Sequence, residues 1–335
     1  MLHKCMDINQ SEEIQNKPSS NKLPFNNLYL NAGLVDGQNK FWMYLMGLAA
    51  TLGGYIIMQV FTILPLFNRA RNMGISQQDI LANQHIIFDS QRLDIDKNLI
   101  LLAQFSLFIG AFVMFWLVVK YVHRKQFTSI LTGFQKFRYN HFFFAFAIWA
   151  AILIVTVLVS YFTSDTNDLV LQFDPSRFFV LFFICIVFLP IQTLCEEVIF
   201  RGYLIQGLSQ LFKNGLVPLI ITSLMFGSAH LSNPETRIFG MGIMLTYYIL
   251  FALFLGAITL LNEGLELAFG IHLANNLVSA LSVTSQAAVL KTNAIFYAKA
   301  DDPAAELLLS FCSIIVVFVV FWMKFKWKDF SLLIK

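Results

Sequence analysis

The feature that most constrains this chain is a series of long apolar segments joined by shorter polar connections. A bilayer-spanning helix needs about 20 mainly apolar residues. Candidate segments are residues 41–68, 98–122, 142–163, 178–206, 216–231, 240–261, 266–288 and 304–323. A backbone in lipid must satisfy its own hydrogen bonds. We therefore expect an all-α, polytopic membrane helix bundle with about eight transmembrane helices.

Composition supports the same expectation and excludes one class of function. The chain has 335 residues, of which 57% are hydrophobic and 13% are charged. Soluble domains carry about 25% charged residues, so the lipid bilayer is the expected surrounding of most of this chain. A formal net charge of +3 gives no basis for nucleic-acid binding.

Charge in the connections predicts the topology. Basic residues dominate the connection 123–141 and the C-terminal tail, whereas acidic residues dominate 164–177. Basic sides are cytoplasmic, which predicts a multi-pass protein with both termini in the cytoplasm. The short loops and the absence of a targeting signal lead us to expect a bacterial inner membrane. The connection 69–97 has mixed charge and leaves its own orientation open. Residues 1–38 are polar and are expected to form a disordered cytoplasmic tail.

A few ionisable residues stand within the apolar segments. A charge near the bilayer centre costs at least ~2.5–3.5 kcal/mol on insertion scales, so such residues are usually functional and paired. Glu197 and Arg201 are four residues apart and share a helix face, where they can pair. Glu196 is rotated by about 100° from Glu197 and has no such partner. It suits a general acid or base, although all three charges could also form a structural network.

Two further clusters contain histidines. His230 ends the apolar run that contains Phe226, and His272 and Asn276 share a helix face at i and i+4. Each alone is more often a structural hydrogen-bonding residue. Together, a glutamate and a histidine can polarise a water, while His272 and Asn276 can hold an oxyanion. That set predicts amide hydrolysis, although Glu196, His230 and His272 are also donors of the kind that bind Zn²⁺.

These motifs, taken in order, resemble the CPBP family of CAAX proteases and bacteriocin-processing enzymes, also called Abi proteins. The family pattern is Glu-Glu-x-x-x-Arg, then Phe-x-x-x-His, then His-x-x-x-Asn or Asp. Here it matches Glu196-Glu197 with Arg201, Phe226 with His230, and His272 with Asn276. The resemblance divides the chain into membrane helices 1–3 with their loops at 39–174, a catalytic membrane core at 175–288, and a last helix with a basic tail at 289–335.

The resemblance implies an intramembrane endopeptidase that cuts a membrane-embedded or lipidated peptide or protein, including the prenylated CAAX type. It implies that Glu196 and His230 activate water and that His272 and Asn276 hold the oxyanion. It also implies that Glu197 pairs with Arg201 and that Phe226 walls the site. We expect no required cofactor, with Zn²⁺ as the alternative. Two other functions stay open, namely a bacteriocin self-immunity or binding protein without turnover, and a proton- or ion-coupled transporter.

One expectation creates a conflict. Counted from Arg177, Glu196 lies about 28 Å along its helix, near the cytoplasmic face of the ~30 Å apolar core. His230, counted from Gly215, falls towards the other face. A shared site requires tilt, a fourth helix that protrudes into the cytoplasm, or a short fifth helix.

Overall fold

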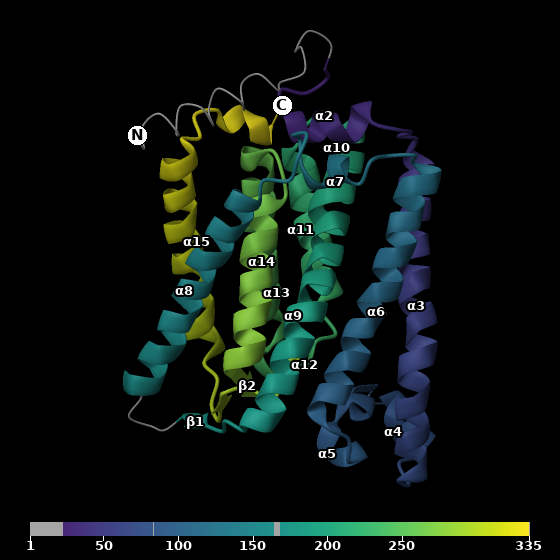
Figure 1. The fold of residues 1–335 in the computed structure, drawn as a ribbon, viewed down its shortest axis with the longest axis vertical. Coiled ribbons are helices and arrows are strands. Elements are labelled where there is room, and N and C mark those ends of the chain that lie inside the picture. The colour runs from purple at the N-terminus through teal and green to yellow at the C-terminus, as the bar shows by residue number, and fades with distance from the viewer. Residues whose placement is uncertain (1–22, 83, 164–167, 335) are drawn as a thin grey trace.

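The computed structural model describes residues 23–82, 84–163 and 168–334 as a bundle of helices that run along one long axis (Figure 1). Helices before the catalytic motifs are α2 (Leu28–Val35), α3 (Phe41–Asn72), α4 (Gln77–Ala82), η2 (Gln84–Phe88), α5 (Ser90–Leu93), α6 (Lys97–Leu117), η3 (Val118–Val122), α7 (Thr128–Leu131) and α8 (Tyr139–Thr163). Later ones are α9 (Pro175–Glu197), η4 (Val198–Leu204), α10 (Ile205–Phe212), α11 (Leu216–Ala229), α12 (Pro234–Phe239), α13 (Met241–Asn262), α14 (Glu266–Ser282), α15 (Pro303–Phe325) and η5 (Phe330–Leu333).

Six helical segments of the described chain are long and apolar enough to cross a membrane. They correspond to the first, second, third, fourth, sixth and eighth predicted segments, which confirms the all-α polytopic class. The two remaining segments are helices that fall short: α11 has 14 residues and α14 has 17. Most of α14 is buried among other helices, so it needs neither the length nor the lipid-facing surface of a membrane span.

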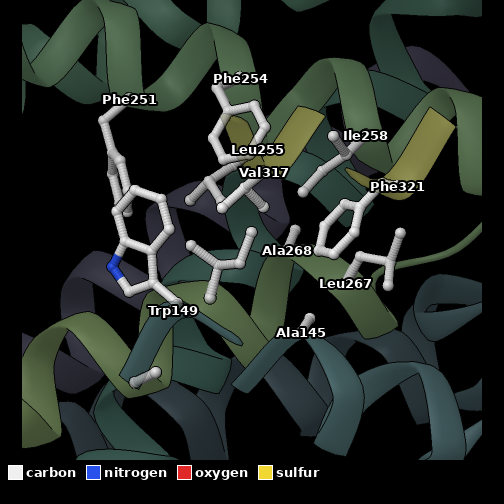
Figure 2. Close-up of a cluster of buried hydrophobic side chains, with 12 residues drawn as sticks. Ala145, Trp149, Phe251, Phe254, Leu255, Ile258, Leu267, Ala268, Val317 and Phe321 are labelled. Atoms are coloured by element: carbon white, nitrogen blue, oxygen red, sulfur yellow. The ribbon is translucent and has the colours of Figure 1, made fainter. Parts of the chain in front are cut away.

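A cluster of 12 buried apolar side chains lies where α8, α13, α14 and α15 meet. Figure 2 shows this cluster of buried side chains, in which Leu255 and Val317 lie between Trp149 and Phe251 on one side and Phe321 on the other. Trp149 is 2% exposed and Phe321 is 0% exposed. By contrast, the outer surfaces of the long helices expose large apolar side chains, including Phe61, Phe162 and Phe183. Soluble monomers rarely expose apolar patches of this kind, so these surfaces fit contact with lipid.

Both ends of the described chain meet at one end of the bundle (Figure 1). The Asn27 side chain caps α2 and donates through Nδ2 to the carbonyls of Leu260 and Leu332. A small sheet of β1 (Leu169–Leu171), β3 (Phe296–Ala298) and β2 (Val283–Ser285) lies at the opposite end. β1 pairs antiparallel and β2 parallel with β3. Ends of the described chain that lie on one side agree with an even number of membrane passes.

Helix α2 corrects the expectation that residues 1–38 form a disordered tail. Residues 28–35 are helical, and Tyr29 and Leu30 are both fully buried. The segment folds because these two side chains enter apolar clusters with α10 and the other helices of that end of the bundle. The remainder of this expectation, residues 1–22, lies outside the described residues.

The helix that carries the glutamate pair changes geometry directly after it. Asp174 caps α9, with Pro175 at its first turn, and the helix continues to Glu197 with Pro190 inside it. Residues Val198–Leu204 then form the π-helical turn η4 before α10 resumes. Such turns leave carbonyls that need other partners. The Tyr29 hydroxyl contacts two carbonyl oxygens at this point, Ile130 O at 2.6 Å and Arg201 O at 3.3 Å.

Candidate active site

The expected conflict of depth disappears because the fourth helix is long and the fifth is short. The helical run through α9, η4 and α10 extends about 24 Å beyond Glu196 at 1.5 Å per residue, to Phe212. α11 then returns from Leu216, and His230 lies about 21 Å along it. Glu196 and His230 therefore lie at similar depths below the connection between α10 and α11.

His272 lies between the two glutamates. Its Nδ1 is 2.6 Å from Glu197 Oε1, and its Nε2 is 3.6 Å from Glu196 Oε2. A carboxylate oxygen can only accept, so Nδ1 carries a hydrogen when it bonds to ionised Glu197. The side chain of His272 is 5% exposed and that of Glu196 is 14% exposed. The imidazole is therefore oriented by a buried carboxylate, and its second nitrogen faces the less buried one.

Arg201 forms the ion pair that the i,i+4 spacing predicted. Its Nη1 donates to Glu197 Oε1 at 2.8 Å, across the π-helical turn. Glu197 is 0% exposed and Arg201 is 2% exposed. The guanidinium carbon also lies 4.3 Å from the centre of the Phe226 ring. One carboxylate oxygen thus holds both Arg201 and His272 in place.

Phe226 connects the glutamate helix to both histidines. Its ring centre is 4.5 Å from that of His230 and 6.0 Å from that of His272. The Phe226 carbonyl oxygen lies 2.7 Å from His230 Nδ1 and must accept from it. In neutral His230, Nε2 is then the nitrogen free to accept a proton. His230 also interacts electrostatically with Glu196, His272 and Arg201.

Asn276 is joined to Glu196 through a residue that the motifs did not include. Gln192 donates through Nε2 to Glu196 Oε1 at 2.6 Å, and its Oε1 accepts from Asn276 Nδ2 at 3.1 Å. Thr193 Oγ1 donates to the same Gln192 oxygen at 3.1 Å. Gln192 precedes Glu196 by four residues, so the i,i+4 rule could have identified it. All seven residues singled out in the sequence therefore belong to one connected cluster.

Metal binding was the alternative for Glu196, His230 and His272. Within the described residues, no three His, Cys, Asp or Glu side chains are arranged to hold a metal ion. Cys195 precedes the glutamate pair, and its side chain is buried at 1% exposure. In this arrangement the donor set of the described residues does not fit a bound metal ion.

Comparison with known proteins gives a family for this region. Residues 175–278 match the type II CAAX prenyl endopeptidase Rce1-like family. An uncharacterized protein, YyaK of Bacillus subtilis strain 168, is 24% identical over 265 residues, which cover 76% of this chain and 82% of YyaK. No solved structure matches the chain. The matched region contains every residue of the cluster described above.

Proposed function

We propose that residues 175–278, a domain of the type II CAAX prenyl endopeptidase Rce1-like family, hydrolyse a peptide bond by means of the cluster around His272. The family match supports an intramembrane endopeptidase in general. In finer detail, the proposed substrate is a membrane-anchored or hydrophobic peptide, including the prenylated CAAX type. The proposed reaction uses no metal ion. One observation carries it: His272 lies between Glu196 and Glu197, and the Phe226 ring contacts both His272 and His230.

Glu196 and His230 are the proposed water-activating pair. Gln192 occupies Glu196 Oε1, which leaves Oε2 as the oxygen that can accept a proton from water. His230 Nδ1 is bound to a carbonyl, so Nε2 is the nitrogen that can accept. The resulting hydroxide attacks the substrate carbonyl carbon, and the abstracted proton passes to the leaving amine as the C–N bond breaks.

His272 and Asn276 are the proposed oxyanion donors. Glu197 holds His272 Nδ1, so Nε2 is the ring nitrogen that is left to face the oxyanion. In the structure, Asn276 Nδ2 donates to Gln192. An oxyanion would compete with Gln192 for that donor, and one preorganised donor of this kind contributes about 10²–10³-fold to rate.

The test is hydrolysis of a lipidated reporter peptide by purified protein in lipid. We expect Glu196→Ala and His230→Ala each to abolish cleavage, and Asn276→Ala to lower kcat by about 10²-fold. Cys195→Ala is the matched control, because it removes a buried neighbour of Glu196 that has no role in the proposed reaction. Cleavage that survives both Glu196→Ala and His230→Ala would contradict the proposal. Binding of the peptide without cleavage by the wild type would favour the binding function instead.

A further inference from the structure

His230 is held by a second aromatic residue from another helix. The ring centre of Tyr248, on α13, lies 4.3 Å from that of His230 at an interplanar angle of 30°. Tyr248 is 8% exposed. His230 itself is the C-terminal capping residue of α11, with φ −99° and ψ 1°, so its ring stands where the regular helix has ended. Contacts from outside α11 must therefore help to fix its orientation.

Tyr248 is in turn anchored by the segment that follows His230. Its hydroxyl donates to the carboxylate of Glu235, on α12, and accepts from Asn233 Nδ2 at 3.0 Å. The same segment binds the main chain of the histidine: Asn233 N and Thr236 Oγ1 contact His230 O at 3.1 and 3.2 Å. The short α12 thus holds the carbonyl of His230 and also the ring that contacts its imidazole.

We propose that Tyr248 and Glu235 are positioning residues for His230. Glu235 fixes the Tyr248 ring, and that ring together with the Phe226 carbonyl fixes the imidazole as the Nδ1–H tautomer with Nε2 available to the reaction. Neither residue touches the reacting atoms. The catalytic meaning of this arrangement rests on the function proposed above, but the tautomer and its dependence on Tyr248 do not.

The surroundings of Glu235 agree with a structural anchor rather than a solvated acid. Burial raises the pKa of its carboxyl group to about 7, and nearby Glu306 adds to the rise, while hydrogen bonds from Asn233 and the backbone of Val289 oppose it. Tyr247, next to the anchored ring, interacts electrostatically with the same two carboxyl groups. A carboxyl group held in such a place normally has specific hydrogen-bonding partners, and the Tyr248 hydroxyl is one of them.

The first test reads the tautomer directly and does not need an active protein. The chain has six histidines, so ¹⁵N-histidine labelling gives a small set of ¹⁵N–¹H correlations. The signal of His230 is the one that disappears in His230→Ala. We expect a single Nδ1–H tautomer in the wild type. In Tyr248→Ala and, to a smaller degree, in Glu235→Ala, we expect averaging between the two tautomers.

Tyr203→Phe is the matched control for this experiment. The Tyr203 hydroxyl lies 2.7 Å from His123 Nε2, so its removal should change the His123 signals and leave those of His230 unchanged. The other histidines report whether Tyr248→Ala is folded, and Tyr248→Leu replaces it if it is not. A His230 tautomer that is unchanged in folded Tyr248→Ala or Tyr248→Leu would overturn the proposal, whether or not the protein cleaves peptides.

The second test measures catalysis. Misplacement of a catalytic group by about 1 Å can cost about 10²-fold, so Tyr248→Ala should lower kcat by that order and leave KM nearly unchanged. Tyr248→Phe keeps the ring and should lose about tenfold or less. A change in KM alone, or an unchanged kcat in folded Tyr248→Ala, would contradict positioning. Wild type without cleavage, but with the predicted tautomer shift, would refute only the proposed function.

Discussion

The ion pair between Glu197 and Arg201 gives the most direct energetic test of the site. Both side chains are almost fully buried, and one Glu197 oxygen binds Arg201 and His272. Replacement of either partner leaves the other as an uncompensated buried charge, which costs about 3–5 kcal/mol. We expect that loss in the free energy of unfolding for Glu197→Leu and for Arg201→Met.

The double variant is the informative case. It removes both charges, so the remaining deficit is the unpaired Nδ1–H of His272, at about 1–3 kcal/mol. The double variant should therefore be more stable than either single variant, although it loses activity because His272 is no longer oriented.

The assay is unfolding by SDS titration in mixed micelles, followed by circular dichroism. Arg92→Met is the control, because Arg92 and Asp89 form an exposed pair at 3.7 Å, and such pairs contribute about 0–1 kcal/mol. Single losses below 1 kcal/mol, or a double loss equal to the sum of the two, would refute the reasoning.

Three further predictions follow from neighbouring contacts. Gln192→Leu should lower kcat by about tenfold or more and leave the fold intact, because Glu196 and Asn276 both lose their shared hydrogen-bonding partner. Kinetics with the reporter peptide measure the loss of kcat, and thermal unfolding shows whether the fold is kept. Gly202→Ala should cost about 1–3 kcal/mol of stability, since its Cβ would lie 2.6 Å from Ile130 Cγ2, and Ile130→Ala should cost less in the Gly202→Ala background than in the wild type in the same unfolding assay. Burial raises the pKa of Glu235 from 4.5 to about 7, so the protonated carboxyl stabilises the fold fully below pH 4.5 and that contribution is lost as pH rises through 7. Between pH 4.5 and 7, the unfolding temperature should therefore fall more steeply with rising pH in the wild type than in Glu235→Gln. Equal slopes for the two proteins would contradict this.

The sequence predicted the membrane helices well because a bilayer imposes length and composition on any helix that crosses it. The same rule could not predict where α11 ends or that α14 lies inside the bundle. Most of α14 is enclosed by protein, and α11 packs one face against other helices, so the lengths of both depend on tertiary contacts. They carry His230, His272 and Asn276, and the site is therefore in the part that membrane rules describe least.

Contacts along one helix were also predictable. The spacing of Glu197 and Arg201 predicted their pairing, and the same rule applied to Gln192 would have found the partner of Glu196. Contacts between helices had no such signal. Nothing in the local sequence indicates that His272 bonds to Glu197 or that Tyr248 contacts His230, because these depend on how distant helices pack.

Helix α2 was missed for a different reason. The N-terminal region is polar on average, and average composition hides a short helix with two large side chains. Tyr29 and Leu30 are both fully buried, and Asn27 caps the helix they belong to. Tyr29 also bonds to carbonyls beside the π-helical turn, so a segment outside the family match contributes to the geometry of the glutamate helix.

The π-helical turn η4 has a consequence for how the gene can change. Its bonds run from i to i+5, so it contains more residues per turn than an α-helix. Its 7 residues turn through roughly the same angle as six residues of α-helix, so removal of one residue from Val198–Leu204 would restore α geometry with α10 at nearly its present rotation. α10 would keep its packing against α2 and α11, whereas the side chains within the turn would point in other directions. A one-codon deletion at this place should therefore disturb the site, which includes Arg201, more than the fold.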